Sequence, residues 1–167
     1  MSELRRIFAI DPGNTESGFV VVEHDGQKIL RVLDKGKVEN DLLLEKVART
    51  PKEWAVAIEM VASYGMAVGA EVFDTCVWIG RFIQAAQGRR IERILRREEK
   101  YYLCGNLSAK DSNIAKALVD RFAYGQTNYG KGTKKNPGFF YGFSKDMWAA
   151  MAVATTYFDK YIRGIQI

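Results

Sequence analysis

Three acidic residues lie where a carboxylate could take part in catalysis. Asp11 ends a short apolar run, and Glu59 ends a second one. Asp146 stands at the start of the last helical pattern. Converging carboxylates repel one another unless a divalent cation neutralises them, and Mg²⁺ and Mn²⁺ prefer such oxygen ligands. A pair of these metals activates water and stabilises the leaving oxygen in phosphodiester hydrolysis. The three acids therefore predict a metal-dependent catalytic site. Asp11 alone has a second interpretation, as a cap of the turn at Pro12-Gly13.

The sequence offers little for other catalytic chemistry. His24 is the one histidine, and its place beside the turn signal Asp25-Gly26 predicts a solvent-exposed, structural residue. Cys76 and Cys104 show no metal-ligand spacing, so we expect reduced, buried thiols in a cytosolic protein. Zinc hydrolases and Cys/His proteases would lack their ligands or bases here.

The apolar runs predict a sheet that brings the first two acids together. Three strands form an antiparallel meander, and a helix then leads to a strand parallel to the first. If these two parallel strands are neighbours, Asp11 and Glu59 lie side by side, and a helix packed across the sheet can bring Asp146 to them. The expected strands are residues 6–11, 18–23, 28–37 and 54–60, and the helix is residues 41–49.

The second half of the chain is predicted to contain three helices and one further strand. The expected helix at 70–86 has a core face of Val72, Phe73, Cys76, Val77, Ile79 and Ile83. A strand falls within 91–103, a helix begins at Ser108 or Asp111, and the last helix spans 145–162 with Ser144 as its N-cap. We expect Asp74 on a polar helix face and Asp111 at a helix N-terminus, neither in catalysis. These elements predict an α/β fold in one domain, residues 1–167, with a mixed five-stranded sheet flanked by helices.

The charge balance suggests a polyanionic partner. The formal net charge is +5, from 25 basic and 20 acidic residues. Residues 124–143 form a Gly-rich, basic, aromatic loop. Candidates for phosphate contacts are Lys131, Lys134, Lys135 and Lys145. The arginines between 89 and 97 alternate with acids, which favours a solvated face for most of them. The chain has neither a membrane-length apolar run nor a signal-peptide pattern, so we expect no membrane association and a cytoplasmic location.

Taken in order, the motifs resemble a known family. They are Asp-Pro-Gly after the first strand, Ile-Glu at the end of the fourth, and Asp-x-x-Ala-Ala-Met-Ala-Val-Ala on the last helix. Across essentially the whole chain, this order resembles the RuvC Holliday junction resolvases, above all the phage and prophage type, within the ribonuclease H-like nuclease superfamily. The resemblance implies a ribonuclease H-like fold, with Asp11, Glu59 and Asp146 as catalytic Mg²⁺ ligands and Mn²⁺ as a substitute. It also implies a homodimer that resolves four-way DNA junctions by paired nicking, in the bacterial host cytoplasm if the protein is phage-encoded.

Two positions bear on that resemblance. It implies that an aromatic side chain in the loop after Glu59 stacks on an unpaired base, and Tyr64 is the candidate; the alternative is a half-buried loop tyrosine. The family commonly has a fourth acid three residues after the one matching Asp146, and here Ala149 stands there. A non-catalytic binder of branched DNA and an RNA nuclease of the YqgF type therefore stay open. Actin-like ATPases would need a second, similar half that the chain lacks.

Overall fold

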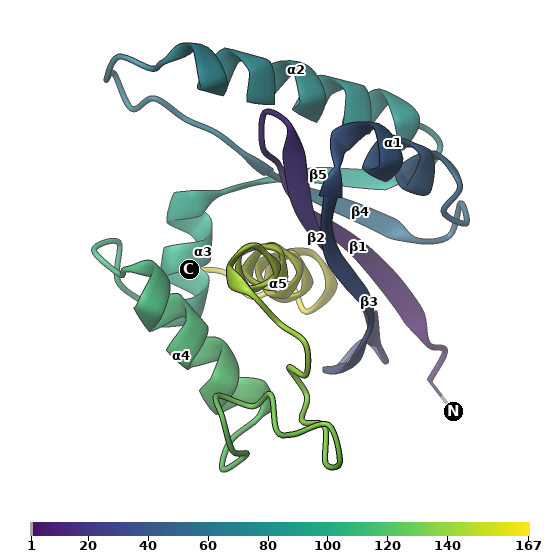
Figure 1. The fold of residues 1–167 in the computed structure, drawn as a ribbon, viewed down its shortest axis with the longest axis vertical. Helices are drawn as coiled ribbons and strands as arrows, with labels where there is room; N and C mark the ends of the chain where they lie inside the picture. The colour runs from purple at the N-terminus through teal and green to yellow at the C-terminus, as the bar shows by residue number, and fades with distance from the viewer. Residues whose placement is uncertain (1) are drawn as a thin grey trace.

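The centre of the molecule is a mixed five-stranded sheet, in the order β3-β2-β1-β4-β5 (Figure 1). The structure is a computed structural model that describes residues 2–167. Strand β2 pairs antiparallel with β1 and β3, while β4 runs parallel to β1 and β5. The expected α/β fold, with a meander and parallel strands in one five-stranded sheet, is thereby confirmed. The strands are β1 Arg5–Asp11, β2 Glu16–His24, β3 Ile29–Glu39, β4 Ala55–Met60 and β5 Arg90–Leu95.

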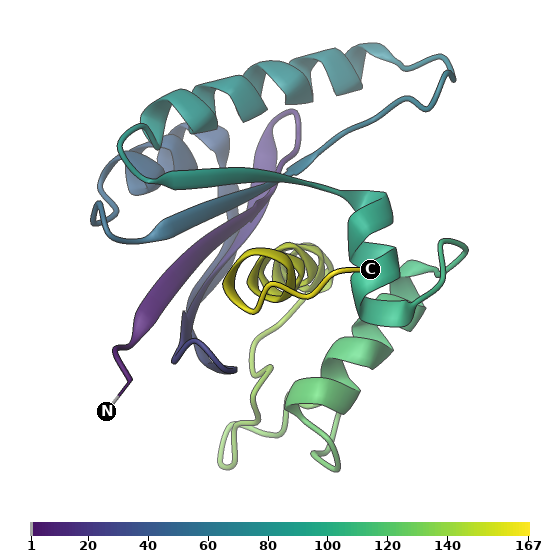
Figure 2. The same ribbon diagram turned by 180° about the vertical axis from the view of Figure 1, so that it is seen from behind.

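Helices cover both faces of this sheet, and α5 is the most enclosed of them. Helices α1 and α2 lie on one face, and α5 crosses the other with α3 and α4 on its far side (Figures 1 and 2). No helix within residues 2–167 is long and apolar enough to cross a membrane. The helices are α1 Asn40–Ala48, α2 Ala70–Ala85, α3 Arg96–Cys104, α4 Asp111–Phe122 and α5 Lys145–Tyr157, and α5 continues into a π-helical turn, η1, Phe158–Ile162.

Alternation along the strands decides which side chains face α5. Ile7 and Ala9 pack toward α5, whereas Phe8 and Ile10 pack toward α1 and α2. By the same alternation Asp11 follows Ala9 onto the α5 face. Helix α5 is buried from Ala150 to Tyr157 because it lies between the sheet and two further helices, and its small residues allow that close packing.

The predicted core face of α2 is partly wrong. Phe73 and Val77 are 63% and 61% exposed, whereas Thr75, Ile79 and Phe82 are buried. At about 100° per residue, Phe73 and Val77 lie on the side of the helix opposite Thr75 and Phe82. A helix that packs on the sheet through one stripe cannot bury both sides, so α2 presents an apolar strip to solvent.

His24 also differs from expectation, because it is buried rather than exposed. Strand β2 extends through His24, which places its side chain on the α5 face together with Val20 and Val22. The imidazole packs edge-on against Phe158, and its Nδ1 accepts a hydrogen bond from the Gly26 amide at 3.1 Å. Burial lowers the pKa of His24, which favours the neutral ring. The two cysteines are free, as predicted, but only half-buried.

The stretch after β5 contains an element that sequence patterns did not indicate. The strand predicted within 91–103 ends at Leu95, and helix α3 follows at once.

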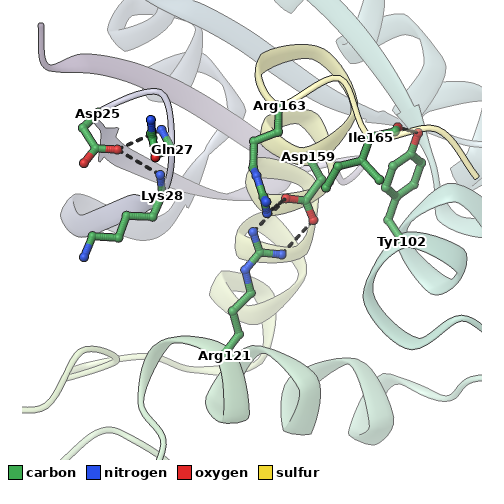
Figure 3. Close-up of polar contacts among 8 residues, drawn as sticks. All are labelled: Asp25, Gln27, Lys28, Tyr102, Arg121, Asp159, Arg163 and Ile165. Atoms are coloured by element: carbon green, nitrogen blue, oxygen red, sulfur yellow. Dashed lines mark hydrogen bonds and ion pairs between the residues drawn. The ribbon is translucent and has the colours of Figure 1, made fainter. Parts of the chain in front are cut away.

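Polar contacts hold α3 and α4 against the end of the chain. Arg121 of α4 donates two 2.7 Å hydrogen bonds to the buried Asp159 carboxylate in η1 (Figure 3). The Tyr102 hydroxyl of α3 donates to the carbonyl of Ile165 at 3.0 Å (Figure 3). These contacts fix α3 and α4 against the end of the chain.

Candidate active site

The turn after β1 is held rigidly by a small polar network. Ser17 Oγ accepts a 3.1 Å hydrogen bond from the Gly13 amide and donates a 2.6 Å bond to Asn40 Oδ1. Asn40 Nδ2 in turn donates to the carbonyl of Gly13 at 2.9 Å. A Cβ at Gly13 would lie 2.2 Å from the carbonyl oxygen of Glu16, so the turn requires glycine. Because Ser17 and Asn40 close the turn, the Asp11 carboxyl is available for another role.

Asp11 and Glu59 lie side by side at the ends of neighbouring parallel strands, in one pocket. Ile10 of β1 pairs with Ile58 of β4 in parallel register, so the next residue of each strand reaches the same edge of the sheet. Burial, reinforced by the neighbouring Glu59 charge, raises the pKa of Asp11 to about 8. Burial raises the pKa of Glu59 as well, while the guanidinium of Arg96 opposes that rise. Protonated Asp11 can therefore donate to the Glu59 carboxylate, so that the pair holds one proton.

Gly18 allows the third acid to reach this pair. It pairs with Asp11 across β1 and β2, and a Cβ there would lie 2.6 Å from the carbonyl oxygen of Asp146. The first turn of α5 therefore sits directly on β2. Lys37 pairs with Gly18 from the other side, on β3, and its Nζ lies 2.9 Å from Asp146 Oδ2. Asp11, Glu59 and Asp146 all line one pocket of about 420 Å³, which we call the acidic pocket.

Three further charged residues, which the sequence did not point to, stand at or behind the acidic pocket. Arg96, at the start of α3, lines it and donates a 2.9 Å hydrogen bond to Glu99 Oε1. Glu99 is completely buried, and its Oε2 has no hydrogen-bond partner among the described residues. Burial and the charge of Glu59 raise the pKa of Glu99 well above its usual range. Asp111, which was expected only to begin a helix, lines the acidic pocket and forms an ion pair with Arg96.

The predicted DNA-binding residues lie at different distances from the acidic pocket. Lys145 lines it. Tyr64 is 60% exposed rather than half-buried, and it borders a hollow of about 360 Å³ that shares Arg96 with the acidic pocket. Lys131 lines a third hollow, beside α4. Lys134 and Lys135 are exposed at the tip of the loop, beyond the bridge between Gly132 and Pro137. Asp74 is exposed on α2, as predicted, and Ala149 lines the acidic pocket.

The donor chemistry of the acidic pocket fits Mg²⁺ through two of its acids. Asp11 and Glu59 present oxygen ligands side by side, and Mg²⁺ is usually bound by one or two carboxylates together with water and substrate phosphates. Asp146 is turned to Lys37, and within residues 2–167 no three His, Cys, Asp or Glu side chains are grouped to hold a metal ion. The Lys37–Asp146 ion pair is partly exposed, and such pairs contribute little to stability, so Asp146 can leave Lys37 at small cost.

Comparison with known proteins identifies the fold. Two solved structures match over 97% of this chain and 97% of their own chains. One is RuvC from Thermus thermophilus, 20% identical with a TM-score of 0.68, and the other is T. thermophilus RuvC in complex with a Holliday junction substrate, 19% identical with a TM-score of 0.67. No protein-family model and no curated protein matches the sequence. The chain thus has the ribonuclease H-like fold of RuvC.

Proposed function

We propose that this protein is a Mg²⁺-dependent endonuclease that resolves Holliday junctions and other branched DNA by paired nicking. The observation that carries the proposal is the side-by-side placement of Asp11 and Glu59 at adjacent strand ends in one pocket. Bringing two acids together in a half-buried pocket is costly, and a divalent cation would relieve that cost. One solved neighbour with this fold is RuvC in complex with a Holliday junction substrate, which supports branched DNA as the substrate class.

Asp11 and Glu59 would hold the metal, which when bound activates water and neutralises the leaving oxygen. Arg96 and Lys145 bring two cationic groups to the acidic pocket, where they would bind the non-bridging oxygens of the scissile phosphate. Asp146, released from Lys37, would join Asp11 and Glu59 in holding the metal. Lys37 would then be free to pair with the DNA backbone.

The remaining predicted contacts surround this centre. Tyr64 is exposed beside Arg96, Arg97 and Lys100, so its ring can stack on a splayed base while the cations meet the backbone. Lys131, Lys134 and Lys135 extend the basic surface along the Gly-rich loop. Together they would place a junction arm across the acidic pocket.

Paired nicking requires two active sites, and helix α2 offers a surface for a second copy of the chain. Phe73 and Val77 form the exposed apolar strip of α2, and a Cβ built on Gly80 would meet no atom within 4 Å. In an antiparallel pair of α2 helices centred near Val77, Asp74 of each chain would face Arg81 of its partner. This match of charge and apolar surface supports a homodimer.

A binding-only role is the second candidate, and it rests on a specific observation. Asp146 is paired with Lys37, and Asp111 with Arg96, so two acids of the pocket already have a cation of the chain beside them. A protein that had lost its metal could keep such pairs. The half-buried pair of acids Asp11 and Glu59 favours the nuclease, because a binding protein gains nothing from placing them side by side.

Cleavage of synthetic substrates tests the proposal. We expect the wild-type protein with Mg²⁺ to nick four-way junctions in preference to duplex, flap and RNA substrates. Asp11→Asn and Glu59→Gln should fold, bind junctions and lose cleavage by orders of magnitude, because each keeps its size and loses a metal-binding charge. Glu45→Gln, an exposed acid on the opposite side of the sheet, is the matched control and should cleave normally. Normal cleavage by Asp11→Asn and Glu59→Gln would contradict the proposed site, and wild-type binding without cleavage would favour the binding-only role.

A further inference from the structure

The hollow beside α4 that Lys131 lines, of about 580 Å³, adjoins the acidic pocket. We call it the Tyr129 pocket. Ser112, Ala115 and Trp148 line both hollows, so the two lie side by side. Tyr129 and Val119 add further apolar surface, and Lys131 and the Lys116–Asp120 ion pair stand at the wall. Most of the lining is therefore apolar, with cations available at its border.

The backbone around Tyr129 has an unfavourable conformation. Asn128 and Tyr129 have φ angles of 53° and 55°, in the left-handed region that residues other than glycine rarely adopt. The Lys131 amide donates a 2.9 Å hydrogen bond to the carbonyl of Asn128. The next residue, Gly130, is buried so tightly that a Cβ would lie 2.5 Å from the Ala123 Cβ. This loop therefore holds Tyr129 in place while 75% of the residue stays exposed.

The opposite wall is equally rigid. Trp148 of α5 packs against Phe140 with ring centroids 4.5 Å apart, and against Phe143 at 5.1 Å. Its remaining surface faces both the acidic pocket and the Tyr129 pocket. Two aromatic side chains on fixed supports thus border a hollow that opens beside the acids. Flat aromatic and apolar walls suit a nucleobase, because every base has a π-face that stacks on such rings.

We propose that the Tyr129 pocket binds an unpaired nucleobase of the strand whose phosphate lies in the acidic pocket. The inference rests on the proposed nuclease function and adds to it a base-binding subsite. The lining that the two hollows share favours this occupant, because a base bound next to the acidic pocket belongs to a nucleotide near the scissile phosphate. Lys131 lies where it can meet the phosphate of that nucleotide. Tyr64 borders a different hollow and cannot serve this subsite.

Junctions carrying 2-aminopurine test the inference, because the fluorescence of this base reports unstacking from DNA and restacking on an aromatic ring. The probe would be moved one nucleotide at a time around the cleavage site, with wild-type protein in EDTA so that binding is read without cleavage. We expect a protein-dependent signal at one position near the scissile phosphate. Tyr129→Ala should abolish that signal and weaken binding by about 5- to 150-fold, the range for loss of one stacked base. Tyr129→Phe should keep both.

Tyr124→Ala is the matched control, because Tyr124 is 85% exposed in the same loop and does not line the pocket. It should behave as the wild type, and equal melting temperatures of the variants would exclude unfolding as a cause. The inference is overturned if Tyr129→Ala gives the same signal and affinity as Tyr124→Ala at every probe position. Failure of the proposed function is seen separately, as absence of Mg²⁺-dependent cleavage by the wild-type protein.

Discussion

The guanidinium of Arg96 donates a 2.9 Å hydrogen bond to Glu99, which is completely buried. Arg96 also lines the pocket that contains Asp11 and Glu59. A buried acid that holds a half-buried arginine at the mouth of a site fixes the direction of a positive charge. The consequence is twofold: the charge attracts a phosphate and opposes a divalent cation at the nearby acids.

The double variant Arg96→Gln/Glu99→Gln tests this relationship, since changing both partners avoids leaving the buried Glu99 carboxyl without its hydrogen-bond donor. We expect junction affinity to fall about 10- to 100-fold, the range for hydrogen bonds to a charged group. Mn²⁺ should bind the DNA-free protein more tightly, because a cation no longer repels it. Fluorescence anisotropy measures the first effect and titration calorimetry the second. Arg97→Gln, an exposed neighbour, is the control, and an unchanged Mn²⁺ affinity in the double variant would contradict the role of Arg96.

The raised pKa of Asp11 predicts how metal-free stability depends on pH. The unfolded chain loses this proton near pH 3.8, whereas the folded protein keeps it to about pH 8. Between these values the folded state binds more protons, so this group makes the free energy of unfolding fall as pH rises. Asp11→Asn cannot lose a proton, so its stability advantage over wild type should grow up to about pH 8, by at most about 1.4 kcal/mol per pH unit, and then level off. Urea denaturation in EDTA measures the difference, and a difference independent of pH would contradict the shift.

The alanine at position 149 leads us to expect weak binding of a second metal. Ala149 lines the acidic pocket one helical turn after Asp146, so a carboxylate there would face the other acids. A crystal of the DNA-free protein soaked in Mn²⁺ should show one strong anomalous peak, at Asp11, and Ala149→Asp should add a second. The control is Ala48→Asp, at an exposed position on α1. Two full peaks in the wild type would indicate that Asp111, which lines the pocket, replaces the missing ligand.

We expect the lysines of the Gly-rich loop to account for part of the salt dependence of junction binding. Lys131→Gln/Lys134→Gln/Lys135→Gln should weaken junction binding and reduce the slope of log affinity against log salt by about 0.9 for each lost duplex phosphate contact. Lys28→Gln changes an exposed lysine in the hairpin that follows β2, at the end of that strand away from Gly18 and Asp11, and should leave the slope unchanged. A loss of affinity with an unaltered slope would show that the three lysines act in some other way.

We expect the exposed apolar strip of α2 to form the interface of a homodimer. Val77→Glu would place a charge in the exposed apolar strip and should convert a dimer into monomers, which sedimentation velocity can measure. Leu42→Glu changes a similarly exposed apolar residue on α1 and should leave the dimer intact. A monomeric wild type, or a dimer that survives Val77→Glu, would contradict the α2 interface.

The sequence by itself determined the sheet and the strand-end acids. Short apolar runs and turn signals are local, so they indicated all five strands, the fifth only within the wide range 91–103. They also indicated the directions of the first four strands and the positions of Asp11 and Glu59 at neighbouring strand ends. The N-terminal position of Asp146 in α5 was likewise readable, because helix starts have a local signature.

Other features depend on which elements pack together, and only the tertiary structure decided them. Helix α3 begins with five charged residues in a row, Arg-Arg-Glu-Glu-Lys, so nothing local distinguished Arg96 or Glu99 from a solvated charge run. His24 became buried because β2 runs one residue further, beneath Phe158. Phe73 and Val77 stayed exposed because α2 packs through its other side. Burial and charge pairing are properties of the neighbours that folding supplies, and for that reason the counter-ions of the acidic pocket could not be read from the chain.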